Sequence, residues 1–266
     1  MYFVFSQAPP KASRYRVRDW LREAGIYSCW AARKPLLSTT NIRKRLDFAK
    51  KMSGYDWSRV VFSDEKIWRI RPVNEHVRVW RRRGDRYDAK YTAKSVAKSL
   101  GVMVWCAINS KGQIVFKRCP ETLNAAGYQD LLGDVLHFIR PSRFVFFGFS
   151  SSYTVSLHRA TKKQVIFQQD NAPPHTAVTT KDWFKKNGVK VMQWPPQSPD
   201  INIVEHIWPE VTRSLTKTIF NTQDELWEAL EEGFKSVQPD YIKKLYGSMT
   251  RQLSAVLVAN GAHTKY

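Results

Sequence analysis

Cysteine is scarce in this chain: the 266 residues include only Cys29, Cys106 and Cys119, and these lie far apart. None of them has the paired CxxC spacing that zinc sites and dithiol redox motifs share. The sequence therefore gives no support for a cysteine-built metal site or a redox motif. We expect the three side chains to be ordinary reduced, buried thiols.

Long apolar runs are also missing. No stretch approaches the roughly 18 apolar residues of a membrane span. The opening MYFVFSQAPP is briefly apolar, but it lacks a charged leading region and is followed by Lys11, so it is a poor secretory signal. We therefore expect no membrane partner.

Acidic residues are few beside basic ones. The 23 Asp and Glu against 43 Lys and Arg give a formal net charge of +20 and a pI near 10.0. Residues 1–100 hold 24 of the basic and 9 of the acidic residues, a net +15. Such an excess predicts a polyanionic partner, of which nucleic acid is the commonest. A ribosomal or histone-like protein is the alternative, but 43% hydrophobic and 13% aromatic residues suffice for a sizeable core.

The order of expected elements indicates an α/β protein with a basic helical start. Residues 13–25 predict a short basic helix capped by Ser13, and residues 31–52 predict a linker that becomes a second basic helix. From residue 59, β-branched and aromatic runs separated by turn residues predict three or four antiparallel strands. Strands and helices then alternate, and the last part of the chain is helical, which favours an α/β layer.

Three acidic residues follow or border apolar runs: Asp64, Asp170 and Glu205, with 34 residues between the last two. We expect the aspartates near strand ends and Glu205 in the first turn of a helix, and ligands of open α/β sheets gather beyond strand ends. Divalent cations such as Mg²⁺ prefer carboxylate oxygens. Each acid alone has a structural explanation, as a turn residue, an Asx turn or a helix-start acid. Together, in a basic chain, they predict metal-dependent chemistry on a nucleic acid.

Four stretches carry a family resemblance: FSDE around Asp64, QQDNAPPHTA around Asp170, WPPQSPDIN before Glu205, and the terminal GAHTKY. With the 34-residue spacing, they resemble the Tc/mariner superfamily of cut-and-paste DNA transposases, from about residue 13 to the end. The resemblance implies an RNase H-like catalytic domain with a mixed five-stranded sheet flanked by helices. It also implies that Asp64, Asp170 and Glu205 are catalytic and hold two Mg²⁺ or Mn²⁺ ions.

The activity implied by the resemblance is strand cleavage at transposon ends, followed by attack of the freed 3′ hydroxyl on target DNA at TA dinucleotides. The implied partners are double-stranded DNA, as terminal inverted repeats and as target, and further protomers in a homodimer or larger assembly. A eukaryotic enzyme of this kind works in the nucleus. Residues 1–30 would then be the remnant of a helix-turn-helix module, residues 31–58 a basic linker and helix, and residues 59–266 the catalytic domain.

Other residues are candidates for supporting this centre. Asn171 and His175 are expected to orient the metal ligands or touch DNA, with a structural histidine as the alternative. Residues 80–87 (WRRRGDRY) predict a basic hairpin for phosphates and protomer contacts. A solvated charged face is the alternative for the basic residues of the two predicted helices. The predicted DNA contacts are Arg14, Arg16, Arg18, Arg43, Lys44, Arg45, Arg81, Arg82 and Arg83.

Three departures from the family pattern keep a second function open. Only residues 13–25 resemble the end of the paired helix-turn-helix modules that precede this catalytic domain in the family. Ile203 and His206 flank Glu205 where relatives usually have proline and asparagine, and residues 141–163 form an aromatic insertion. The alternative is a truncated or domesticated relic that acts only as a DNA-binding protein. A structure-directed nuclease without strand joining is the third possibility.

Overall fold

The computed structural model describes residues 13–26, 36–70, 100–139, 165–215 and 219–266. The chain divides into two compact units, Met1–Leu36 and Leu37–Tyr266. Two features expected from the sequence, the basic hairpin at residues 80–87 and the aromatic insertion at residues 141–163, lie outside the described residues.

The described part of the smaller unit is a single helix, α1 (Arg14–Glu23). The Ser13 hydroxyl accepts a hydrogen bond from the Arg16 amide at 3.3 Å, so Ser13 caps the helix as the sequence predicts. Gly25 follows the helix with a φ of 72°, the left-handed conformation that ends many helices. The side chains of α1 face solvent along most of its length.

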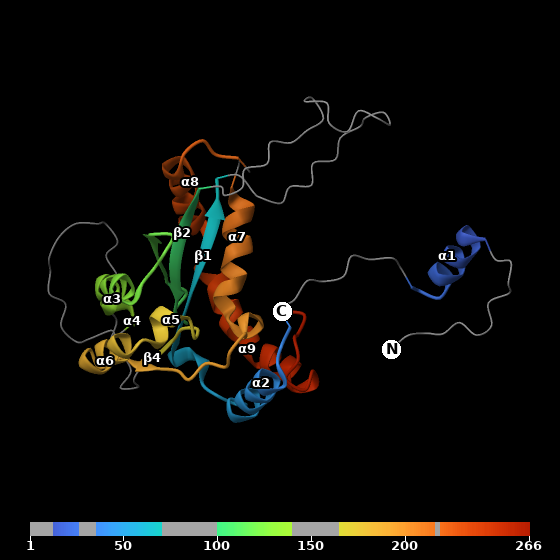
Figure 1. Cartoon of the computed structure of the whole chain (residues 1–266), viewed down its shortest axis with the longest axis horizontal. Helices are drawn as coiled ribbons and strands as arrows, with labels where there is room; N and C mark the ends of the chain where they lie inside the picture. Colours follow the sequence, from blue (N-terminus) through green and yellow to red (C-terminus); the bar gives the residue numbers. More distant parts are fainter. Residues whose placement is uncertain (1–12, 27–35, 71–99, 140–164, 216–218) are drawn as a thin grey trace. The chain divides into compact units, whose positions relative to one another are not determined.

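The larger unit is built on a mixed five-stranded sheet with the order β3-β2-β1-β4-β5 (Figure 1). The first three strands are antiparallel neighbours, whereas β4 pairs parallel with β1 and β5 pairs parallel with β4. This arrangement confirms the predicted fold class. The strands are β1 (Val60–Arg69), β2 (Gly101–Ile108), β3 (Ile114–Cys119), β4 (Ile166–Gln168) and β5 (Lys190–Val191).

Alternating side chains of the central strands enter two apolar cores. Phe62 and Val104 belong to the larger core, which α7, α8 and α9 complete. Val61 and Trp105, their neighbours in sequence, belong to the second core, which α3 and α6 complete. The sheet is therefore buried on both faces, as an α/β layer requires.

Helices of the larger unit cover these faces (Figure 1). The α-helices are α2 (Thr39–Lys51), α3 (Ala125–Asp134), α4 (Leu136–Ile139), α5 (Pro173–Thr176), α6 (Val178–Lys186), α7 (Ile207–Ser214), α8 (Gln223–Ser236) and α9 (Pro239–Val258). Short 3-10 turns are η1 (Trp57–Arg59), η4 (Pro199–Ile201) and η5 (Ile203–His206). No helix in the described ranges is long and apolar enough to cross a bilayer.

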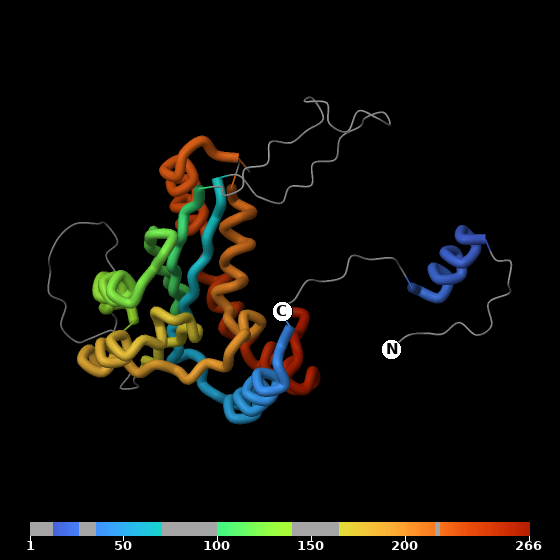
Figure 2. The backbone as a smooth tube through the Cα atoms, viewed as in Figure 1, coloured from blue at the N-terminus to red at the C-terminus, as the bar shows by residue number. Residues whose placement is uncertain are grey.

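The helix α2 packs beside α9 and the C-terminal tail (Figure 2). A Cβ atom at Gly261, where φ is 83°, would collide with the Ile42 carbonyl, so only glycine allows this approach. Our division of the sequence set residues 31–58 apart as a linker and helix. In the structure, the chain from Leu37 onward packs in one unit with the sheet.

Both described cysteines are buried on strands of the sheet. Cys106 lies on β2 and Cys119 ends β3, and each is a free thiol. This agrees with the expectation of buried, unpaired thiols.

Candidate active site

Asp64 lies in the middle of β1, not near its end as we predicted. The strand continues to Arg69 because β2 pairs with it along its whole later length. The parallel partner β4 is much shorter, and its pairing with β1 stops where Phe62 faces Gln168. Asp64 and Asp170 each lie two residues beyond this last pair. Both therefore lie at the same end of the parallel pairing between β1 and β4.

Asp170 combines internal hydrogen bonds with an open face. Its Oδ1 accepts hydrogen bonds from the Ala172 amide at 2.9 Å and from His175 Nδ1 at 2.6 Å. Burial alone would raise the pKa of Asp170, but these bonds hold it below its usual value. The side chain remains 52% exposed. Asp170 is therefore an ionised carboxylate that can still bind a ligand from the cleft side.

Glu205 lies in η5, a single turn that leads directly into α7. Asn202 starts this turn, because its Oδ1 accepts a hydrogen bond from the Val204 amide at 3.2 Å. The Asn202 Nδ2 donates to the Ser63 carbonyl at 3.1 Å. Since Ser63 directly precedes Asp64, Asn202 ties the turn that carries Glu205 to the strand that carries Asp64. The expected position of Glu205 in a first helical turn is confirmed.

One cleft of about 380 Å³ is lined by Asp64, Asp170 and Glu205 together. Burial raises the pKa of Asp64 well above its usual value, and the charges of Glu205 and Glu65 raise it further. Burial also raises the pKa of Glu205. A hydrogen bond with Asp64 and the charge of Lys66 lower it and so partly offset the effect of burial. Residues 194–199 form much of the remaining wall. The three acids predicted from the sequence therefore converge on one site.

Trp208 and Lys66 are neighbours of Asp64 that the sequence analysis missed. The Trp208 Nε1 donates a hydrogen bond to Asp64 Oδ2 at 3.3 Å. Lys66 lies two residues beyond Asp64 and thus on the same face of β1. Burial lowers the pKa of Lys66, and the charges of Glu205 and Asp64 act in the opposite direction. The two-residue spacing on a strand is the signal that could have identified Lys66.

His175 bridges two acids. Its Nδ1 lies 2.6 Å from Asp170 Oδ1, and its Nε2 lies 3.3 Å from Glu65 Oε1. Burial lowers the pKa of His175, but the interactions with Asp170 and Glu65 outweigh this effect and raise it to about 9. In the metal-free protein this shift favours the cationic form of the ring at neutral pH.

These contacts of His175 decide how a second cluster of donors is interpreted. Donor atoms of Glu65, Asp170 and His175 lie within 4.8 Å of one another, a grouping that could hold a metal ion. Both ring nitrogens of His175 already lie close to carboxylates, so the cluster holds Asp170 in place. The orienting role predicted for His175 agrees with this contact. Asn171 acts on the neighbouring wall, where its Nδ2 donates to the Trp194 carbonyl at 3.0 Å.

Arg45 was predicted to contact DNA, and this prediction was wrong, because its side chain is fully buried. Its guanidinium donates to both carboxylate oxygens of Asp200, each at 2.7 Å. Asp200 also accepts hydrogen bonds from the Thr264 amide and hydroxyl at 3.1 and 2.9 Å. The remaining guanidinium hydrogen bonds go to Gly261, Ala262, Gln197 and Ser198.

This network fixes one wall of the acid cleft. It joins α2 to the C-terminal tail and to Gln197 and Ser198, which both line the cleft. A planar guanidinium suits such a bidentate, buried pairing better than an ammonium would. The terminal GAHTKY stretch therefore supports the active-site loop, although it lies far from it in the sequence.

The other predicted DNA contacts remain predictions. Arg43 and Lys44 are exposed on α2, and Arg14, Arg16 and Arg18 are exposed on α1. The Arg43 Nε lies 3.9 Å from Asp47, a weak surface pair that leaves the arginine accessible. The run Arg81, Arg82 and Arg83 lies outside the described residues.

The acid cleft suits a divalent cation by the chemistry of its donors. Asp64, Asp170 and Glu205 supply only carboxylate oxygens, which Mg²⁺ and Mn²⁺ prefer. Asp64 and Glu205 line the same cleft, and burial raises the pKa of both. A bound cation would relieve their repulsion and favour their ionised forms. These three residues are therefore the ones that could hold a metal.

Comparison with known proteins identifies the family. A family model described as DDE superfamily endonuclease matches residues 59–227, and a transposase model of the helix-turn-helix type matches residues 5–53. The Tc1 transposase of Caenorhabditis elegans is 30% identical over 267 residues, covering 99% of this chain and 92% of that protein. The chain belongs to the Tc/mariner transposases of the DDE superfamily.

Other members of the family are similar over comparable lengths. The Tcb1 transposase of Caenorhabditis briggsae is 30% identical over 99% of this chain and 92% of its own length. The transposase helix-turn-helix match spans both α1 and α2, and so crosses the boundary that we drew at residue 30.

Solved structures support the fold. The chain superposes on the Mos1 mariner paired end complex with Mn at a TM-score of 0.72 and 21% identity, covering 95% of this chain and 72% of that one. The catalytic domain of Mos1 mariner transposase gives a TM-score of 0.62 at 18% identity, covering 88% of this chain and all of the domain. The chain therefore has the RNase H-like fold of these catalytic domains.

Proposed function

We propose that this transposase cuts DNA strands at the ends of its own element and joins the freed 3′ ends to target DNA at TA dinucleotides. The observation that carries the proposal is the convergence of Asp64, Asp170 and Glu205 on one cleft of the RNase H-like sheet. Three acidic side chains at one place in a strongly basic chain suit cleavage of a phosphodiester, whose reaction builds negative charge on entering and leaving oxygens.

We propose that Asp64, Asp170 and Glu205 hold two Mg²⁺ or Mn²⁺ ions. Structures of the Mos1 catalytic domain are described with Mg and with Mn, which supports the choice of ion. Such ions supply Lewis-acid stabilisation of the charge that develops on the phosphoryl oxygens. The residues around the acids then have supporting roles that follow from their contacts.

The protein's own groups position the acids and set their protonation. Cationic His175 keeps Asp170 ionised and fixes its Oδ1, so that the exposed part of the carboxylate faces the cleft. Trp208 fixes Asp64 through its indole hydrogen bond. Asn202 and the Arg45–Asp200 network hold the turn of Glu205 and the loop before it. Together these contacts preorganise the site before substrate arrives.

The partners of this function are double-stranded DNA and further copies of the chain. Exposed Arg14, Arg16, Arg18, Arg43 and Lys44 are proposed to contact phosphates, which would position the protein without reading sequence. A homodimer or larger assembly would pair the two ends of the element, and the name of the Mos1 paired end complex describes that protein in such an assembly. We propose the nucleus as the place of action.

Cleavage by purified protein tests this proposal. The probe is a labelled duplex that ends in an inverted repeat identified by sequencing the DNA around the gene. Incubated with Mn²⁺ or Mg²⁺, it should be nicked at the repeat and then joined to TA-containing DNA. Asp170→Ala should reduce cleavage by at least about 10³-fold, because one of three ligands to the reacting centre is lost. The exposed acid Asp182 provides a matched control, and Asp182→Ala should cleave normally.

The outcomes separate the three candidate functions. Binding without any nicking, unchanged in Asp170→Ala, would show a DNA-binding relic. Nicks without joined products would show a nuclease. Joined products that depend on Asp170 would support the transposase.

A further inference from the structure

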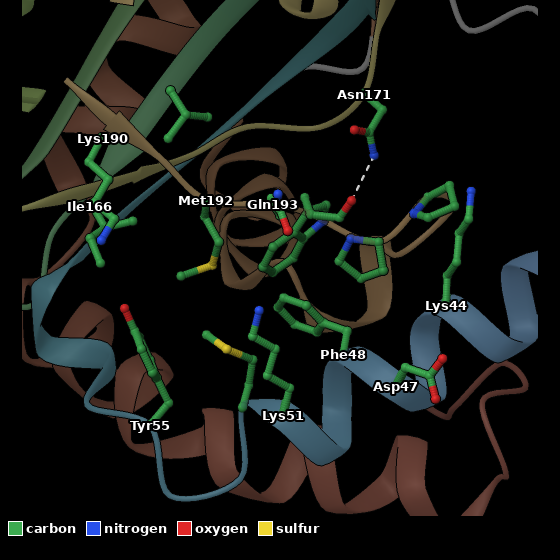
Figure 3. Close-up of a pocket in the computed structure, with 15 residues that line it drawn as sticks. Lys44, Asp47, Phe48, Lys51, Tyr55, Ile166, Asn171, Lys190, Met192 and Gln193 are labelled. Atoms are coloured by element: carbon green, nitrogen blue, oxygen red, sulfur yellow. Dashed lines mark hydrogen bonds between the residues drawn. The ribbon is translucent and has the colours of Figure 1, made fainter. Parts of the chain in front are cut away.

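A second groove opens beside the acid cleft. It has a volume of about 870 Å³ and runs between α2 on one side and β5 with the segment after it on the other (Figure 3). Its floor is apolar, with Phe48, Met52 and Met192 among the lining side chains. Phe48 packs edge-on against Trp194, with ring centroids 5.2 Å apart.

Lysines stand on both walls of this groove. Lys44 and Lys51 lie two helical turns apart on the same face of α2, and Lys190 lies on β5 opposite them. Figure 3 shows Lys51 reaching from α2 into the space between the walls. All three are exposed, and in the described part of the chain none is paired with a carboxylate. Asp47, the acid among the lining residues, lies 3.9 Å from Arg43.

The groove adjoins the acid cleft. Asn171, Trp194, Pro195 and Pro196 line both spaces. The hydrogen bond from Asn171 Nδ2 to the Trp194 carbonyl, at 3.0 Å, holds this shared wall together. A polymer whose scissile phosphate lies at Asp170 would pass along these shared residues to reach the groove.

We propose that this groove binds an unpaired stretch of the DNA strand that continues from the scissile phosphate. Lys51 and Lys190 contact the phosphates from opposite walls, and the apolar floor receives sugar and base faces. A duplex hides its base faces by stacking, whereas an unpaired strand exposes them to side chains such as Phe48. The proposal rests on the proposed cleavage function and assigns the path of the strand within it.

A peptide is the competing occupant, because β5 is an edge strand that could pair with an added strand. However, β5 spans only Lys190–Val191 and offers few backbone groups. The groove has lysines on both walls and lies beside the acid cleft that is proposed to cleave DNA. These features favour nucleic acid over a peptide as the occupant.

The salt dependence of DNA binding tests the groove without requiring cleavage. The probe is a duplex of arbitrary sequence carrying a single-stranded extension, compared with the same duplex made blunt. Losing two phosphate contacts on a single strand should reduce the steepness of log K against log salt by about 1.4. We expect this change in Lys51→Gln/Lys190→Gln with the extended probe and little change with the blunt one.

Two further variants provide controls. Lys111→Gln removes an exposed lysine from the turn between β2 and β3, outside both the groove and the cleft, and should leave the slope unchanged. Lys51→Arg/Lys190→Arg keeps both charges and should restore the wild-type slope. Because all of these side chains are exposed, each variant should have the melting temperature of the wild type. Measuring it by thermal unfolding checks that each variant is folded.

The results divide cleanly. An unchanged slope in the double glutamine variant, or an equal change in Lys111→Gln, overturns the proposal. A variant that binds DNA normally but loses self-association in sedimentation shows a protein-binding groove and also overturns it. If the slope falls as expected while the wild type cuts no DNA, the strand path stands and the cleavage function fails. If the wild type cuts DNA but the slope of the double glutamine variant does not change, the cleavage function stands and the proposed strand path fails.

Discussion

Two carboxylate sites of this protein lie close in the fold and differ in how their negative charge is stabilised. Asp200 is buried, but Arg45 and Thr264 satisfy both its oxygens, so its pKa falls below the usual value although burial opposes this. Asp64 and Glu205 are held close together, and their pKa values are raised by burial.

The difference separates a structural carboxylate from one kept for a ligand. The protein supplies an internal guanidinium to Asp200 and so gains a rigid loop. Beside Asp64 and Glu205 it supplies Lys66, which offsets their repulsion only in part. The unrelieved charge is the condition under which a divalent cation gains most from binding. The candidate active site is thus the place where the carboxylates are not fully neutralised by groups of the protein.

The largest expected effect on stability comes from breaking the buried pair of Asp200 and Arg45. Asp200→Asn leaves Arg45 buried without its counter-charge and should lower the free energy of unfolding by about 3–5 kcal/mol. The matched control is Asp182→Asn, which removes an exposed partner of Lys185 and should cost less than about 1 kcal/mol. Urea unfolding measures both. An equal loss of unfolding free energy in both variants would show that the buried Asp200–Arg45 pair does not stabilise the fold.

His175 provides an intermediate effect through pH. Its folded pKa of about 9 exceeds the ordinary value of 6.5, so its stabilisation is complete below pH 6.5 and is lost as pH rises through 9. Without divalent metal, unfolding free energy should therefore fall by up to about 3 kcal/mol across this window. His175→Gln should flatten that part of the profile. A variant profile parallel to the wild type would contradict a cationic His175.

The smallest effect should have the opposite sign to that of Asp200. Asp64 has a raised folded pKa, so its ionisation destabilises the metal-free protein as pH rises above the unfolded value. Asp64→Asn should therefore raise Tm at neutral pH by a few degrees, corresponding to about 1 kcal/mol. Differential scanning calorimetry in chelator gives the answer. A lower Tm in the variant would show that Asp64 is a satisfied structural residue.

Local patterns in the sequence predicted much of this architecture. The β-branched and aromatic runs predicted the antiparallel strands, and Ser13 predicted the start of α1. The trio was predicted because each acid borders an apolar run within a specific motif. The place of Asp64 within its strand was not predicted, because the length of β1 depends on pairing with β2, more than thirty residues later.

Long-range partners explain what the sequence analysis missed. Arg45 has the same local surroundings as Arg43 and Lys44, and only its contacts with Asp200 and Gly261 decide that it is buried. The raised pKa of His175 likewise depends on Asp170 and on Glu65, and Glu65 comes from the distant strand β1. Neither spacing nor helix periodicity carries this information.

The central claim is that Asp64 and Glu205 are left for a divalent cation, and thermal unfolding with and without Mn²⁺ tests it most directly. Ligand linkage predicts that Mn²⁺ at 100 times its dissociation constant stabilises the wild type by about 2.7 kcal/mol. Asp64→Asn/Glu205→Gln should be more stable than the wild type without metal and should lose the response to Mn²⁺. A wild type that does not respond, or a double variant that responds equally, would contradict the account.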